Sequence, residues 1–186
     1  MREMTNPSGP AAHWQARYAA GHYGTAPNEF LQTAVAALPA GDTLCLADGE
    51  GRNSVFLGGQ GHRVTAVDLS AKGIAKARRL AAERGVALST VVADLATFDL
   101  GLARWDVIVS IFAHTPPAVR QRVHAAVVAA LRPGGVFVLE AYTPAQIGRG
   151  TGGPATADMT ITLAELTEEL AGLTMTHGLE VMSRGW

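Results

Sequence analysis

The segment Leu44–Asn53, with the sequence LCLADGEGRN, is the feature that most constrains how this chain folds. A short apolar run ends in a glycine-rich turn, a helical pattern follows, and a second apolar run ends in Asp68. Gly49 and Gly51 lack side chains, so the backbone there can pass close to a ligand, and a carboxylate at the tip of the next strand can accept hydrogen bonds from ribose hydroxyls. This order of parts is typical of a parallel α/β sheet that holds a nucleoside cofactor.

Short, nearly all-apolar runs recur along the chain and alternate with helical patterns. Such runs are expected for strands that are buried on both faces of a parallel sheet. They predict an α/β fold, a Rossmann-like open, mostly parallel sheet with helices on both faces. The expected strands are Thr43–Ala47, Arg63–Asp68, Leu88–Ala93, Trp105–Ile111 and Val136–Ala141.

Helix signals fill the intervals between these runs. Ser70 is a candidate N-cap and Gly85 a candidate helix stop, and Val119, Val123 and Val127 recur with helical spacing after two prolines. The further expected helices are Pro27–Leu38 and one that begins with a capping box of Thr162 and Glu165 and reaches about Ala171. Right-handed crossovers would leave the carboxyl ends of the strands facing one shared crevice.

Composition places the chain among folded globular proteins. A length of 186 residues fits one domain, and the net charge of −1 without a Lys- or Arg-rich block argues against a nucleic-acid partner. Cys45 is the only cysteine, and no long apolar segment or signal-peptide core is present, so we expect a cytoplasmic protein without a membrane partner. We expect a single domain over residues 1–186, with 1–26 covering the cofactor and 143–160 forming a substrate loop.

Four motifs in order resemble class I S-adenosylmethionine-dependent methyltransferases. They are DGEGRN at 48–53, VDLS at 67–70, ADL at 93–95 and LRPGG at 131–135. Within that superfamily the chain most resembles the small bacterial enzymes of the tellurite-resistance and thiopurine methyltransferase type. The resemblance implies methyl transfer from S-adenosylmethionine, with S-adenosylhomocysteine as product, to a small-molecule acceptor such as a thiol, a thiopurine-like heterocycle or a chalcogen oxyanion.

The resemblance also implies roles for individual residues. The glycine loop would hold the methionine part of the cofactor, Asp68 the ribose and Asp94 the adenine, with Leu95 and Phe112 on either side of the adenine ring. Aromatic residues near the N-terminus would lie beside the positive sulfur. The candidate cofactor-binding residues are Trp14, Arg17, Tyr18, Tyr23, Asp48, Gly49, Glu50, Gly51, Asn53, Asp68, Leu69, Asp94, Leu95 and Phe112.

Candidate catalytic residues follow the fourth and fifth strands. His114 can take a proton from a nucleophile or can simply cap the next helix. Glu140 is costly to bury unless it is paired or functional, and Tyr142 faces the same crevice. The remaining histidines show no ligand-like spacing, so we expect no metal.

Two departures from the family pattern leave alternatives open. Cys45 occupies the position where the first strand usually carries an acid, so either Asp48 or Glu50 would contact the methionine amino group. The C-terminal hairpin is incomplete, because Leu179–Trp186 supplies only a sixth strand; this would leave an exposed edge on a monomer or homodimer. The alternatives are a module that binds S-adenosylmethionine with little turnover and an NAD-dependent oxidoreductase, although Ser54 stands where a dinucleotide loop needs its third glycine.

Overall fold

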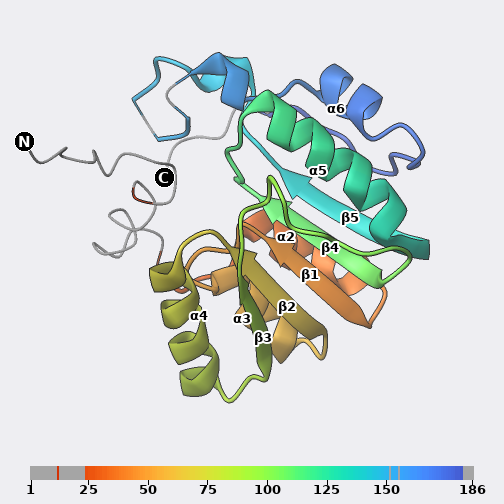
Figure 1. The fold of residues 1–186 in the computed structure, drawn as a ribbon. Coiled ribbons are helices and arrows are strands. Elements are labelled where there is room, and N and C mark those ends of the chain that lie inside the picture. The colour runs from red at the N-terminus through yellow and green to blue at the C-terminus, as the bar shows by residue number, and fades with distance from the viewer. Residues whose placement is uncertain (1–11, 13–23, 151, 155, 182–186) are drawn as a thin grey trace, which may run out of the picture.

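The chain folds around one five-stranded parallel sheet in the order β3-β2-β1-β4-β5 (Figure 1). The computed structural model describes residues 12, 24–150, 152–154 and 156–181. The sheet confirms the predicted Rossmann-like α/β fold, with every observed pairing parallel. Its strands are β1 (Asp42–Leu46), β2 (Arg63–Asp68), β3 (Leu88–Val92), β4 (Trp105–Ile111) and β5 (Leu131–Glu140).

The fifth strand begins earlier than its sequence predicts. Trp105 pairs with Leu131, the register then shifts, and regular pairing resumes between Val107 and Val136. The LRPGG motif therefore lies inside an irregular strand instead of forming a turn before it. Gly135 permits this path, since a Cβ there would lie 2.9 Å from the carbonyl oxygen of Arg132 and 3.1 Å from that of Trp105.

Two predicted helices begin at their expected capping residues, whereas the helix predicted over Pro27–Leu38 covers only Glu29–Ala34 and continues as a short 3₁₀ turn. The Ser70 side chain accepts a hydrogen bond from the N–H of Gly73, and Gly85 ends the same helix in the left-handed conformation. Thr162 and Glu165 form the predicted capping box, although the helix ends at Glu169. The helices are α2 (Glu29–Ala34), α3 (Arg52–Gly59), α4 (Ala71–Arg84), α5 (Pro117–Ala130) and α6 (Leu163–Glu169), with short 3₁₀ turns η1 (Val35–Ala37), η2 (Pro144–Gln146) and η3 (Ala157–Met159).

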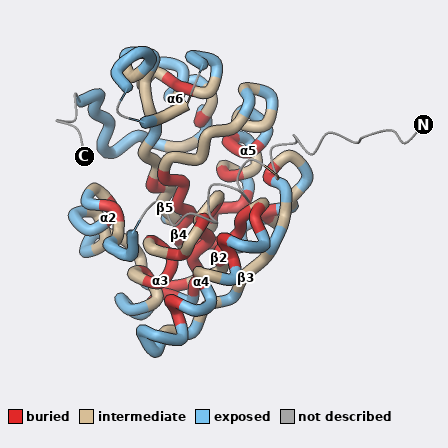
Figure 2. Tube along the Cα trace, turned by 90° about the vertical axis from the view of Figure 1, so that its left-hand side faces the viewer, coloured by how far each residue is buried: buried red, intermediate tan, exposed pale blue. Residues whose placement is uncertain are grey.

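The sheet separates two hydrophobic cores. Leu44 and Leu46 of β1 pack with α5 residues such as Val127 on one face, whereas Cys45 packs with Leu31 of α2 on the other. This division follows from the alternation of side chains along a strand. Figure 2 shows the buried segments concentrated along the central strands.

The predicted sixth strand is not present in the part of it that the structure describes. Leu179–Val181 forms no strand, and both Leu179 and Val181 are exposed. Residues 182–186 lie outside the described residues. Within the described chain, β5 pairs only with β4 and is an edge of the sheet.

Candidate active site

The glycine loop after β1 is built from residues with left-handed backbone. Ala47, Gly49 and Gly51 have φ of 49°, 62° and 90°. Ala47 stands where the family pattern has its first glycine, and its positive φ is a strained conformation for a residue with a Cβ. Packing also requires glycine at position 51, because a Cβ there would clash with Ala77 of α4, at 2.6 Å from its Cβ. The loop therefore packs closely against α4.

Asp68 ends β2 beside this loop and is buried. Its Oδ2 accepts a 2.9 Å hydrogen bond from the N–H of Gly49, and its Oδ1 accepts one of 2.7 Å from the N–H of Ser70. Burial raises the pKa of Asp68, and the two backbone bonds oppose that rise. Each carboxylate oxygen has a further lone pair, so Asp68 can still accept hydrogen bonds from a diol.

The two acids predicted to compete for the methionine amino group have different surroundings. Asp48 accepts hydrogen bonds from the N–H and the hydroxyl of Ser54, at 3.3 and 2.5 Å, and burial raises its pKa to about 6. Glu50 pairs with Lys76 of α4 at 2.5 Å. Glu50 is thus already neutralised by a cation, which leaves Asp48 as the better candidate for an ammonium group.

Asn53, predicted as a cofactor contact, is buried and used within the fold. Its Oδ1 accepts a 3.0 Å hydrogen bond from the N–H of Asn28. It fixes α3 relative to the start of α2, and Gly51, not Asn53, occupies the N-cap of α3.

The predicted adenine contacts do not all come together. Asp94 is exposed after β3 and its Oδ1 accepts a 2.8 Å hydrogen bond from the N–H of Ala96. Leu95 belongs to the core on the α5 face, whereas Phe112 packs against the core on the opposite face. The structure thus places Leu95 and Phe112 with different cores, one on each face of the sheet. Leu69 is half-buried directly after Asp68.

Aromatic rings gather at the carboxyl ends of β4 and β5. The ring centroid of Tyr142 lies 4.7 Å from that of Phe112 and 5.4 Å from that of His114, and both pairs are stacked. Phe112 has a φ of 53°, and its N–H donates a 2.8 Å hydrogen bond to the carbonyl of Glu140. His114 and Tyr142, two of the three predicted catalytic residues, thus stack on one another at this edge of the sheet.

Glu140 is half-buried and paired, as its position in an apolar strand requires. Its Oε2 accepts a 2.6 Å hydrogen bond from Nδ2 of Asn28, and burial raises its pKa. The other candidates, Trp14, Arg17, Tyr18 and Tyr23, lie outside the described residues.

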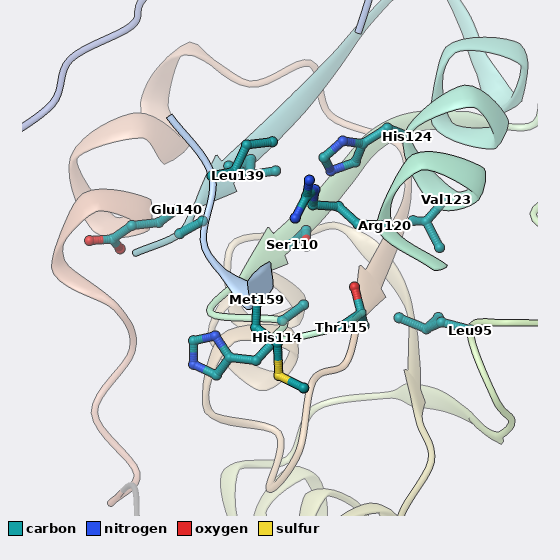
Figure 3. Close-up of a pocket in the computed structure, with 13 residues that line it drawn as sticks. Leu95, Ser110, His114, Thr115, Arg120, Val123, His124, Leu139, Glu140 and Met159 are labelled. Carbon is teal, nitrogen blue, oxygen red and sulfur yellow. The ribbon is translucent and has the colours of Figure 1, made fainter. Parts of the chain in front are cut away.

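A small cavity of about 30 Å³ lies beside this cluster (Figure 3). It extends from His114 and Glu140 toward α5, where Arg120 and His124 reach its wall. Sequence reasoning missed these two residues, although their spacing of four on a predicted helix, beside Val123, was the available signal. The lining residues are Leu95, Ser110, Ala113, His114, Thr115, Arg120, Val123, His124, Leu139, Glu140, Ala141, Met159 and Ile161.

The described residues contain no cluster of three His, Cys, Asp or Glu side chains suited to a metal ion. None of the helices in this part of the chain has the length and apolarity needed to cross a membrane.

Comparison with known families gives the class of the protein. A model of the methyltransferase domain family matches residues 43–135, which is half of the chain and includes the glycine loop, Asp68, Asp94 and LRPGG. The chain belongs to this family. It is an S-adenosylmethionine-dependent methyltransferase, and the buried acceptor Asp68 beside a left-handed glycine loop fits that cofactor.

Solved structures show the same fold. A structure from work on the conversion of a disulfide bond into a thioacetal group during echinomycin biosynthesis matches with a TM-score of 0.70 and 21% identity, over 87% of this chain and 77% of that one. A TehB-like S-adenosylmethionine-dependent methyltransferase from Corynebacterium glutamicum matches with a TM-score of 0.55 and 24% identity, over 86% and 78%. An S-adenosylmethionine-dependent methyltransferase from Mesorhizobium loti is 29% identical, with a TM-score of 0.53, over 61% of this chain and about half (53%) of that one. No curated protein gives a match.

Proposed function

We propose that this methyltransferase acts on a small molecule through a soft nucleophile: a thiol, a thiopurine-like heterocycle or a chalcogen oxyanion. This places the chain with the tellurite-resistance and thiopurine methyltransferase type. The observation that carries the proposal is the stacking of Tyr142 on His114, a residue that lines, with Glu140, one small cavity at the carboxyl ends of β4 and β5. The similarity in fold to a TehB-like protein supports the same assignment.

The cofactor side of the site would work by position. When bound, S-adenosylmethionine supplies an electrophilic methyl group on a positive sulfur. The glycine loop and Asp48 hold the methionine part, Asp68 accepts hydrogen bonds from the ribose, and Asp94 contacts the adenine. Orienting two reactants in this way lowers a barrier by as much as about 7 to 11 kcal/mol in well-ordered models.

The acceptor side would manage a proton. Glu140 lies half-buried with a raised pKa, and His114 stacks on Tyr142 at the same end of the sheet. Either group can accept the proton of an acceptor that binds un-ionised. A thiol that is already ionised needs little such help, because the thiolate is itself the nucleophile.

We also propose how the remaining parts of the chain serve the site. Residues 1–26 cover the cofactor, and residues 143–160 form a substrate loop within a single domain. The bond from the N–H of Ile161 to the carbonyl of Tyr142, at 3.0 Å, supports the second assignment because it ties the end of that loop to the aromatic cluster. The protein would act in the cytoplasm as a monomer or homodimer, without a nucleic-acid or membrane partner.

Calorimetric titration with S-adenosylhomocysteine tests the proposal, with NADH as control and Asp68→Ala as the variant. We expect micromolar binding of S-adenosylhomocysteine to the wild type, at least tenfold weaker binding to the variant, and no binding of NADH. Methylation of a thiol such as thiophenol, followed as S-adenosylhomocysteine formation, then separates an enzyme from a module that only binds. Tight binding without any turnover on thiol, thiopurine or chalcogen acceptors would favour the module.

A further inference from the structure

Arg120, on the first turns of α5, clamps two segments that are distant in sequence. Its Nε and Nη2 both donate to the carboxylate of Glu169 in α6, at 3.2 and 3.0 Å. Its Nη1 donates to the carbonyls of Asp158 and Thr160, at 3.1 Å each. One guanidinium thus fixes the end of the substrate loop and α6 against α5, in the fork geometry that only arginine provides.

The clamp determines which side chains face the cavity. The carbonyls of Asp158 and Thr160 are bound by Arg120, and the side chains of the next residues, Met159 and Ile161, line the cavity. Thr160 is extended, with φ −107° and ψ 171°, so neighbouring residues point to alternate sides. Figure 3 shows Met159 and His114 among the side chains that line the cavity.

The positive charge that lines this cavity is already paired with a carboxylate. Arg120 is the only Arg or Lys among the described residues that line the cavity, and its guanidinium is committed to Glu169. His124 also bonds to Glu169, at 2.6 Å through Nδ1, and burial lowers its pKa. Glu140 also lines the cavity, but its carboxylate turns toward Asn28, from which it accepts a 2.6 Å hydrogen bond (Figure 3). An anionic acceptor would therefore meet a neutral histidine and an arginine whose charge Glu169 already balances, without a further cation among the described lining residues.

The remaining lining is mainly apolar. Leu95, Val123 and Leu139 form its inner surface, and Met159 has a flexible thioether side chain that adapts to different shapes. A cavity of about 30 Å³ has room for roughly one water, so a larger acceptor must displace the side chain that moves most easily. Met159 is half-buried and unbranched, which makes it that side chain.

We propose that Arg120 is a positioning residue which, through Glu169, holds Met159 and Ile161 as the specificity wall of the acceptor site, and that this wall selects an acceptor with an apolar face over a hydrated oxyanion. The inference rests on the proposed methyl transfer to a small molecule and narrows its acceptor class.

The experiment compares thiophenol with selenite as acceptors, using both initial rates and equilibrium binding to the S-adenosylhomocysteine complex. We expect the wild type to bind and methylate thiophenol in preference to selenite. Arg120→Lys keeps the charge but loses the fork. It should raise KM for thiophenol by roughly tenfold, equivalent to about 1.4 kcal/mol, and leave S-adenosylhomocysteine affinity unchanged.

Arg132→Lys is the matched control. Arg132 donates to Asp106 at 2.6 Å and to Asp42 at 3.1 Å, at the amino ends of the strands. The same chemical change there removes a similar clamp far from the acceptor cavity. It should reduce stability without changing KM for thiophenol.

Met159→Lys adds a cation to the wall, and Met159→Leu preserves its apolar character. We expect the lysine variant to lose preference for thiophenol and gain affinity for selenite, and the leucine variant to keep the preference for thiophenol over selenite. This change of preference does not depend on stability, so it distinguishes a specificity wall from a purely structural clamp.

The outcomes separate the two proposals. Absence of S-adenosylhomocysteine binding to the wild type would remove the proposed function, and the acceptor inference with it. If S-adenosylhomocysteine binds, three results would each contradict the proposed specificity wall while leaving the proposed function standing. They are tighter binding of selenite than thiophenol, no binding of thiophenol, or equal effects of Arg120→Lys and Arg132→Lys on KM.

Discussion

The side-chain amide of Asn28 donates a 2.6 Å hydrogen bond to Oε2 of Glu140, although the two residues are 112 positions apart. Asn28 is 2% exposed and also caps α2, where its Oδ1 accepts from the N–H of Leu31 at 2.9 Å. One buried side chain therefore both starts a helix and pairs a carboxylate at the proposed acceptor site.

This relationship predicts the effects of two substitutions of Asn28. Asn28→Ala removes the cap and leaves Glu140 without its donor, and should lower the free energy of unfolding by about 2 to 4 kcal/mol. Asn28→Ser retains a capping oxygen but has no amide to reach Glu140, and should cost less. Urea denaturation of both variants gives these values, and equal losses would contradict the separate contribution of the Glu140 bond.

Glu140→Gln tests a chemical role for the carboxylate. The amide oxygen of Gln can still accept from Asn28, so stability should change by less than about 1 kcal/mol. If Glu140 accepts a proton from the acceptor, the wild-type rate with an alkanethiol, which is un-ionised at neutral pH, rises with pH through the raised pKa of Glu140, and the variant lacks that rise. Identical pH–rate profiles for the two proteins would show that Glu140 does not accept the proton of the acceptor.

Gly51→Ala and Gly59→Ala form a matched pair of substitutions that tests how tightly the glycine loop packs against α4. Gly51 has φ 90°, and an added Cβ would lie 2.7 Å from Cα of Ala77, whereas nothing lies within 4 Å of a Cβ added at Gly59. Gly51→Ala should cost about 2 to 4 kcal/mol and Gly59→Ala should be neutral or stabilising by up to about 1 kcal/mol. Thermal unfolding of both proteins checks this. A Gly51→Ala variant as stable as the wild type would show that α4 moves away without cost.

The raised pKa of Asp48 predicts that the stability of the protein depends on pH. Burial raises its pKa to about 6 from a usual value of 3.8, so the folded protein holds a proton that the unfolded chain releases. The wild type should therefore lose stability as pH rises from about 4 through 6, by at most about 3 kcal/mol. Asp48→Asn lacks this loss, so the stability difference between variant and wild type should grow over that range and stay constant above it.

The same acid predicts how the affinity for S-adenosylhomocysteine changes with pH. If the Asp48 carboxylate contacts the amino group of the ligand, binding should tighten as pH rises through about 6, and Asp48→Asn should abolish that dependence. Calorimetry at pH 5 and pH 7 measures both. A dependence that persists in the variant would transfer the role to another group.

Much of the fold was readable from the sequence because its signals are local. β2 and β4 were predicted to the residue, and Ser70 with Gly85 marked both ends of α4, since capping and apolar patterning act within a few residues. The glycine loop and Asp68 were placed correctly for the same reason: a strand, a turn and the next strand tip follow one another along the chain. The start of β5 was wrong, because a bulge opposite Trp105 depends on pairing with another strand.

In the candidate site, local sequence patterns predicted the positions of residues along the strands but not their long-range contacts. Sequence placed Asp68, His114 and Glu140 at strand ends, and parallel strands bring such ends to one edge of the sheet. Only the tertiary structure decided that Glu50 pairs with Lys76, that Asn53 supports Asn28, and that Leu95 and Phe112 lie on opposite faces. It also revealed the clamp of Arg120 on Glu169. Hydrogen bonds between residues far apart in sequence depend on packing, and no pattern within one segment specifies the partner that packing supplies.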